Sequence, residues 1–198
     1  MFPETFIPGD PFYHDYAPLE SESFRTLERR FTWQAIIIPD PETECIAAAC
    51  ITHHMTVAIG VTERPARAGT LYNTLLYFGP DGTILRRHRT LMPTYNERMA
   101  WGMGDGTTLR TIETPQVIIG SLIGWENFMP LARTVLYAQG ERIHVAPTLN
   151  PGSEPWLCAM RQIANEGRMW VISVGCLLRE SDLPSEVVAL GLAEKGRS

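Results

Sequence analysis

The sequence predicts an α/β protein that forms one folding unit over residues 1–198. Short apolar runs typical of strands alternate with segments that repeat apolar residues at helical spacing. A composition of 44% hydrophobic and 20% charged residues suits a packed core. The sequence has neither an internal repeat nor a linker rich in Gly, Ser or Pro, so a single domain is the simplest organisation.

The first helix is expected to begin at Asp40 and Pro41. The aspartate side chain caps free amide groups, and the proline presets the backbone angle for the first turn. The helix should bury one face, which is predicted by the i, i+3, i+4, i+7 repeat of Ile46, Ala49, Cys50 and His53.

The remaining elements follow as strands and helices. Strands are expected at 56–61, 70–79, 83–89, 117–124, 142–148 and 169–175, and further helices at 130–140 and 153–168. The tight turn GPDG between the second and third strands indicates an antiparallel hairpin. The later strands alternate with helices, which implies parallel pairing with helical cover.

Charge and hydropathy narrow the class of partner. A net charge of −5 and a pI near 5.5 argue against nucleic acid and anionic membranes, because both need clustered positive charge. The sequence lacks an apolar run of the roughly 20 residues that a spanning helix requires. Its start also lacks the pattern of a secretory leader, so a cytoplasmic protein is expected.

The cysteines and the lysine bear on metal sites, disulfides and the source of positive charge. The four cysteines lie in apolar segments without CxxC spacing, which argues against a metal site or a disulfide scaffold and favours small core residues: Cys45, Cys50, Cys158 and Cys176. Arginine supplies all positive charge except that of one lysine, Lys195.

Two glutamates and one glycine occupy unusual settings. Glu4 lies in FPETF, where neighbouring aromatic residues would desolvate its carboxyl group and raise its pKa toward that of a general base; the alternative is a surface loop glutamate. Glu97 has a similar apolar, glycine-rich neighbourhood and the same two interpretations. The segment IIGSLIGWENFMPLA predicts a strand that runs into a helix, a favoured place for a nucleophile, but Gly124 stands at the turn.

The histidines add little to this picture. His53 and His54 are adjacent and would point about 100° apart on a helix, so they cannot chelate together. His88 lies in the basic run RRHR, a pattern more typical of a solvated strand face.

The wording and order of several segments resemble the nitrilase branch of the carbon–nitrogen hydrolase superfamily. These segments are FPETFIPG, AIGVTER, TLYNTLLYFGPDGTILRRHR, HRTLMPT, GWEN, VAPT and MRQIANEGR. They extend from about residue 2 to about residue 180, nearly the whole chain.

This resemblance implies an α-β-β-α sandwich and a cofactor-free, metal-free reaction. In such proteins a cysteine thiolate attacks a nitrile or amide carbon, a glutamate takes the thiol proton, a lysine stabilises the developing charge, and a second glutamate assists. Ammonia leaves, and water then releases a carboxylic acid. The implied substrate is a small-molecule nitrile or amide.

When these roles are carried over by position, this chain keeps the two glutamates but lacks the lysine and the cysteine. Glu4 matches the base glutamate and Glu97 the second glutamate. Thr90 stands where the lysine belongs, in HRTLMPT, and Gly124 stands where the cysteine belongs, in GWEN. Glycine has no atom that can form a covalent intermediate, and threonine brings no positive charge. Removing one member of such a unit costs roughly a millionfold in rate.

The resemblance therefore predicts a nitrilase-like homologue that is catalytically inactive. An alternative is a hydrolase that works through another thiol, Cys176 or Cys158, or with a complementing chain. A second alternative is an assembly module, because family members associate through helices near MPLARTVLYAQ. The distant Lys195 is a poor substitute for the missing lysine.

The resemblance also predicts that the domain is incomplete. An opening strand and helix are expected before FPE, and further strands after VIS, so the sandwich would be partial with apolar surface uncovered. Such a surface favours a homo-oligomer or association with a related chain.

Overall fold

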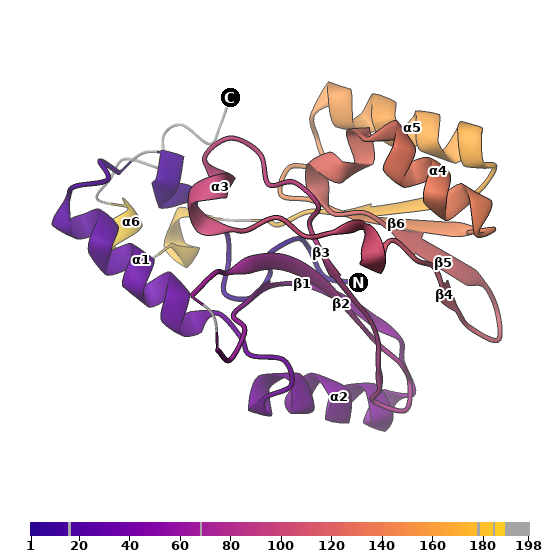
Figure 1. Cartoon of the computed structure of the whole chain (residues 1–198), viewed down its shortest axis with the longest axis horizontal. Helices are drawn as coiled ribbons and strands as arrows, with labels where there is room; N and C mark the ends of the chain where they lie inside the picture. Colours follow the sequence, from indigo (N-terminus) through magenta and orange to yellow (C-terminus); the bar gives the residue numbers. More distant parts are fainter. Residues whose placement is uncertain (16, 68, 178, 184, 189–198) are drawn as a thin grey trace.

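The computed structural model describes residues 1–15, 17–67, 69–177, 179–183 and 185–188. Lys195 lies outside these residues. Two sheets carry the fold (Figure 1). The first has the order β1-β2-β3 and is antiparallel: β1 (Val57–Glu63), β2 (Tyr72–Phe78) and β3 (Ile84–Arg89). The second has the order β4-β5-β6-β7: β4 (Ile112–Glu113), β5 (Ile118–Ser121), β6 (Ile143–Pro147) and β7 (Trp170–Val174).

Strand pairing follows the sequence patterns. β2 and β3 form the expected antiparallel hairpin across GPDG. β5, β6 and β7 are parallel, as the strand and helix alternation predicted, and the short β4 adds an antiparallel edge. Both predictions are confirmed.

Helices cover the outer faces of both sheets. In Figure 1, α2 lies below the first sheet, and α4 and α5 lie above the second. The α-helices are α1 (Glu22–Gln34), α2 (Pro41–His53), α3 (Glu97–Ala100), α4 (Pro130–Ala138), α5 (Glu154–Gly167) and α6 (Ser185–Val188). The 3₁₀ turns are η1 (Phe12–Asp15), η2 (Gly106–Thr108), η3 (Gly124–Phe128) and η4 (Glu180–Asp182).

The two sheets pack face to face. Between them lies an apolar cluster, with Ala58, Leu75 and Tyr77 from the first sheet against Ile112 and Val145 from the second. Separate clusters join α2 to the first sheet and α4 and α5 to the second. The layers are therefore helix, sheet, sheet, helix, which confirms the α/β class and the α-β-β-α sandwich.

The helix α2 begins as predicted, and only part of the predicted face is buried. Asp40 Oδ1 accepts from the Thr43 backbone amide at 3.1 Å, so the aspartate cap is present. Thr43 and Cys50 are buried, whereas Ala49 and His53 are exposed. The prediction is confirmed for Cys50 and for Ile46, which packs against the same cluster. It is wrong for Ala49 and His53, because the helix is apolar on most sides and its sequence hardly distinguishes one face from another.

Two further expectations need correction. Cys45 and Cys158 are exposed helix residues, although Cys50 is a core residue as expected. The helix α1 was not predicted from the sequence, because it buries only Leu27 and Phe31, and these pack against residues distant in the chain. Of the helices in the described part of the chain, none is long and apolar enough to span a bilayer.

Candidate active site

The candidate site is built around the turn that leaves β5. After Ser121 the chain passes through two buried apolar residues to Gly124, which begins η3. Gly124 has φ +46°, a left-handed conformation that glycine adopts without steric cost. The turn places this residue at the end of the sheet, as the strand-to-helix pattern predicted.

Glu126 ties this turn to the neighbouring loop. Its carboxyl group accepts from the Ile123 amide at 2.8 Å and from the Leu91 amide at 2.7 Å. His88 Nε2 lies 3.0 Å from Glu126 Oε2, and both side chains are fully buried. The expectation that His88 lies on a solvated strand face was wrong, because this face of β3 packs against the second sheet.

Asn127 fixes the turn from the other side. Its Nδ2 donates to the Leu122 and Gly124 carbonyl oxygens, each at 2.9 Å. Its Oδ1 lies 2.8 Å from His144 Nε2, and His144 Nδ1 lies 3.1 Å from Glu141 Oε2. Because every member of this network is paired, the network holds the turn in one conformation.

Glu4 is brought to the turn by a segment that runs beside β1. The Phe2 amide donates to the Ala58 carbonyl oxygen at 2.8 Å, and the Gly60 amide donates to the Pro3 carbonyl oxygen at 3.1 Å. A Cβ atom on Gly60 would lie 2.7 Å from Glu4 Cα, so only glycine permits this approach. The close approach of the two backbones therefore explains why the segment AIGVTER has a glycine at position 60.

The Glu4 carboxyl group faces Gly124 directly. A Cβ atom built on Gly124 would lie 2.7 Å from Glu4 Oε2 and 2.9 Å from Oε1. Glu4 exposes 6% of its surface, and Asn73 Nδ2 donates to its Oε1 at 2.8 Å. The interpretation of Glu4 as a surface loop residue is excluded by this burial.

Thr90 is linked to this pair through Asn73. Its amide donates to the Asn73 carbonyl oxygen at 2.8 Å, which links it to the residue that binds Glu4. Thr90 is buried, and its hydroxyl has no hydrogen-bond partner among the described residues.

Glu97 begins α3 near the same place and is half-buried. Its Oε2 accepts from the Thr94 amide at 2.6 Å and from the Thr94 hydroxyl at 2.8 Å. Burial, followed by repulsion from Glu97, raises the pKa of Glu4 well above its usual range, and the Asn73 hydrogen bond offsets this only in part. The predicted direction for Glu4 is confirmed, but Phe2 and Phe6 are exposed, so the sandwich interior desolvates it.

The two cysteines considered as substitutes lie in different places. Cys176 follows β7, and its Sγ lies 4.0 Å from the Glu4 backbone oxygen. Burial, followed by the negative charges of Asp10 and Glu4, raises the pKa of its thiol. Cys158 is exposed on α5 and donates to Glu154 at 3.4 Å, outside the site.

Sequence reasoning missed several of these residues. Asn73, His88, His144 and Asp10 received no role, although Glu126 and Asn127 stood in the quoted GWEN segment. A usable signal was present at GWEN, because two polar residues directly after an apolar strand and a turn commonly bond back to the backbone of that turn.

An α-β-β-α sandwich with a buried glutamate opposite the turn after a central strand defines the carbon–nitrogen hydrolase type of protein. The sequence profile of the family described as carbon-nitrogen hydrolase matches residues 1–186. This chain belongs to that family, within its nitrilase branch.

Individual relatives agree with this assignment. The aliphatic nitrilase of Sinorhizobium fredii (strain HH103) is 41% identical over 190 residues, which cover 94% of this chain and 60% of that protein. Nitrilase 2 of Arabidopsis thaliana is 39% identical over 187 residues, 93% of this chain and 54% of that protein. This chain therefore spans between about half and three fifths of the length of these two relatives.

A solved structure shows the same fold. Nit3 of Saccharomyces cerevisiae, a member of branch 10 of the nitrilase superfamily, superposes with a TM-score of 0.70 at 17% sequence identity. The superposition covers 90% of this chain and 62% of that protein.

Proposed function

We propose that this nitrilase-like chain does not by itself hydrolyse nitriles or amides. One observation carries the proposal: the Glu4 carboxyl group faces the Cα atom of Gly124, so a base is present where no nucleophilic atom exists. Without a thiol or hydroxyl at this turn, neither a thioimidate nor an acyl intermediate can form there.

The residue at position 90 supports the same proposal. A nitrile or amide that is attacked by a nucleophile gathers negative charge, and a fixed cation is the strongest stabiliser of that charge. Thr90 offers only a buried hydroxyl, and the other carboxyl group near Glu4, that of Glu97, adds negative charge.

The alternative is a hydrolase that uses Cys176. Its sulfur lies near the backbone of Glu4, whereas the Glu4 carboxyl group points to Gly124. The raised pKa of Cys176 also keeps the thiol protonated at neutral pH, and the thiolate is the nucleophile. Both facts favour an inactive chain over a hydrolase that uses Cys176.

A direct assay tests the proposal. The purified chain is incubated with aliphatic nitriles, aromatic nitriles and the matching amides, and ammonia is measured alongside mass spectrometry of the intact protein. We expect neither ammonia above background nor a covalent adduct. Sustained ammonia release abolished by Cys176→Ser would establish the alternative.

A restored variant tests whether the rest of the site is retained. Gly124→Cys with Thr90→Lys returns the sulfur and the cation. The new Cβ would lie 2.7 Å from Glu4 Oε2, so the end of the Glu4 side chain must shift, and the φ of +46° adds backbone strain that the control variant shares. We expect a nitrile-derived adduct on residue 124 in this variant and none in the matched control, Gly124→Ala with Thr90→Lys. A restored variant without an adduct would contradict a retained site.

We also propose that the chain associates with copies of itself or with a related chain through α4. Leu131 exposes 83% of its surface and Val135 exposes 40%, so this helix presents apolar side chains to solvent. Size measurement over a range of concentrations tests this, with Leu131→Glu as the disrupting variant. A monomer at every concentration would remove the proposal.

A further inference from the structure

The outer edge of β7 is unpaired in the described part of the chain. β7 is the last strand in the order β4-β5-β6-β7, and its inner edge pairs with β6. The Trp170 amide donates to the Arg142 carbonyl oxygen at 3.1 Å, so the backbone groups of Trp170 point to the β6 side. Because these groups alternate along a strand, those of Val171 and Ser173 point to the free edge.

The two edges of this sheet differ in their protection against pairing. At one edge, β4 is two residues long and carries the exposed Glu113, and both features discourage another strand from pairing there. At the other edge, β7 has five residues, and the segment MWVISVGC (169–176) contains neither a charged residue nor a proline. The edge of β7 is therefore a template on which a further strand can pair.

β7 also has an uncovered apolar face. Val171 packs against the cluster beneath α5, and Ser173 Oγ accepts a hydrogen bond from α5 at 2.9 Å. Side chains alternate along a strand, so Trp170 and Ile172 lie on the opposite face. On that face the neighbouring Val145 of β6 packs against the first sheet. Trp170 nevertheless exposes 79% of its surface and Ile172 exposes 47%, so the first sheet does not cover this strand.

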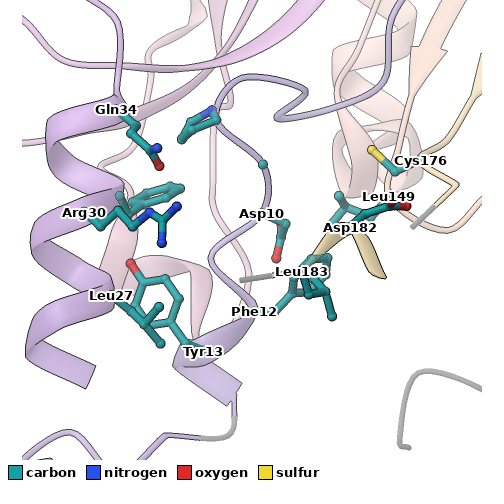
Figure 2. A pocket seen from close by; sticks show the side chains of 13 residues that line it. Asp10, Phe12, Tyr13, Leu27, Arg30, Gln34, Leu149, Cys176, Asp182 and Leu183 are labelled. Atoms are coloured by element: carbon teal, nitrogen blue, oxygen red, sulfur yellow. The ribbon is translucent and has the colours of Figure 1, made fainter. Parts of the chain in front are cut away.

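The residues that flank β7 limit the length of the free edge. Arg168 has φ +50°, a left-handed conformation, so the extended backbone begins after it. Beyond the other end, Cys176 lines a cavity of about 310 Å³ together with Asp10, so the chain has left the sheet there (Figure 2). The free edge is therefore the strand itself, and Ile172 lies at its centre.

We propose that β7 pairs antiparallel with β7 of a second copy of this chain, about a two-fold axis at Ile172. This register is the one that pairs the strand over its whole length. Val171 then exchanges backbone hydrogen bonds with the partner's Ser173, and Trp170 lies across from the partner's Val174. The second sheets of the two copies become one continuous sheet.

A second copy fits this edge for two reasons. The two-fold axis gives each free backbone group and each exposed apolar side chain of β7 a partner, and an uncharged strand meets no like charge when it pairs with itself. The buried area also suits a reversible dimer. The two Trp170 side chains together would bury about 400 Å², against about 1,600 Å² for a standard stable interface. We therefore expect a dissociation constant in about the micromolar range.

This contact is separate from the association proposed for α4, and it depends neither on that contact nor on the loss of catalysis. Leu131→Glu disrupts the α4 surface and leaves β7 unchanged, so the size of this variant reports on β7 alone. The wild-type chain would use both surfaces and should form species larger than a dimer.

Sedimentation velocity of the Leu131→Glu chain over a wide range of concentration tests the proposal. We expect a reversible equilibrium between monomer and dimer. Addition of Ile172→Lys should weaken the dimer at least about tenfold, because two lysines would lie directly opposite each other. The matched control is Ile84→Lys, the same change on β3 at a residue that exposes 38% of its surface, and it should leave the dimer unchanged.

Cross-linking tests the register. The exposed and half-buried cysteines are first removed by Cys45→Ser, Cys158→Ser and Cys176→Ser. Ile172→Cys should then give a disulfide-linked dimer under mild oxidation, because opposite residues at a two-fold axis lie within the roughly 7 Å that a disulfide requires. Val174→Cys should not, because its two copies would lie about 13 Å apart along the strands.

Several outcomes would overturn the proposal. A Leu131→Glu chain that is monomeric at every concentration would mean that something other than a second copy covers the edge. Full dimerisation of Ile172→Lys, or equal cross-linking at positions 172 and 174, would exclude this pairing. Thermal unfolding checks that each variant is folded, and Trp170→Lys provides a second disrupting variant. Because the readouts are size and cross-linking, their failure is separate from any result for ammonia release.

Discussion

Glu63 and Glu4 are two buried carboxyl groups associated with the first sheet, and they differ in the positive charge around them. Glu63 lies at the end of β1, is fully buried, and accepts from Thr74 at 3.0 Å, from Arg87 Nε at 2.8 Å and from Arg89 Nε at 3.2 Å. Within the described part of the chain, Glu4 accepts one side-chain hydrogen bond, from Asn73.

The difference appears in their pKa values. Burial alone would raise the pKa of Glu63, but the hydrogen bonds from Arg87 and Arg89 outweigh it and lower the pKa. For Glu4, burial dominates and the pKa rises. The comparison teaches that Glu63 is an ion-paired part of the framework. Glu4 instead has a raised pKa without a cationic partner, which is typical of a functional site.

The largest effect is expected when the framework carboxylate is removed. Glu63→Gln leaves two arginines facing an amide, and we expect the free energy of unfolding to fall by about 2–4 kcal/mol at neutral pH. The value stays below that of a fully buried pair because the Arg87 side chain is 36% exposed and the Arg89 side chain 29%. Urea denaturation measures it.

The control for this prediction is Glu113→Gln, an exposed position in β4 where a change within about 0.5 kcal/mol is expected. The depressed pKa of Glu63 also has a pH consequence. Its contribution is present above the unfolded-state pKa and is lost as the pH falls through the folded-state pKa. An acid transition of the same shape in Glu63→Gln and wild type would contradict this assignment.

The sequence predicts most of the sheet order because apolar runs, turn residues and strand alternation act locally. The strands from β1 to β3 and from β5 to β7 were all predicted, apart from small shifts at their ends. The helix α1 and the short β4 were not, because their places depend on contacts with distant parts of the chain.

Less of the site could be predicted. The resemblance indicated Glu4 and Gly124, and the structure places them in contact distance. The bond from Asn73 to Glu4 joins residues 69 positions apart, and that from His88 to Glu126 joins residues 38 apart. Such pairs arise only when the two sheets pack together, so local patterns carry no signal for them.

Replacing Glu4 should have an effect of opposite sign to that at Glu63. Glu4→Gln removes a carboxyl group whose ionisation is opposed by burial and keeps an acceptor for Asn73. We expect the free energy of unfolding to rise by about 1–2 kcal/mol at neutral pH. Urea denaturation at several pH values measures it.

The pH dependence provides the sharper test at Glu4. Because its folded-state pKa is raised, the unfolded chain releases this proton first, and stability falls as the pH rises from the unfolded-state pKa to the folded-state pKa. Above that range the loss is complete. Glu4→Gln should remove this fall in stability. If the variant is less stable than wild type at neutral pH, the predicted opposite sign of the effects at Glu4 and Glu63 is contradicted.

The smallest expected effect is at Thr90, a buried threonine linked to Glu4 through Asn73, and it is compared with Thr74, a buried threonine that binds Glu63. The Thr90 hydroxyl has no partner among the described residues, so Thr90→Val should raise the free energy of unfolding by about 0.5–1 kcal/mol. The Thr74 hydroxyl donates to Glu63, so Thr74→Val should lower it by about 1–2 kcal/mol. Both variants make the same change in shape, so the difference in sign reports the hydrogen bond alone. Equal effects at the two positions in urea denaturation would mean that the hydroxyl of Thr90 is paired in solution, and the polar environment beside Glu4 would then be as complete as that around Glu63.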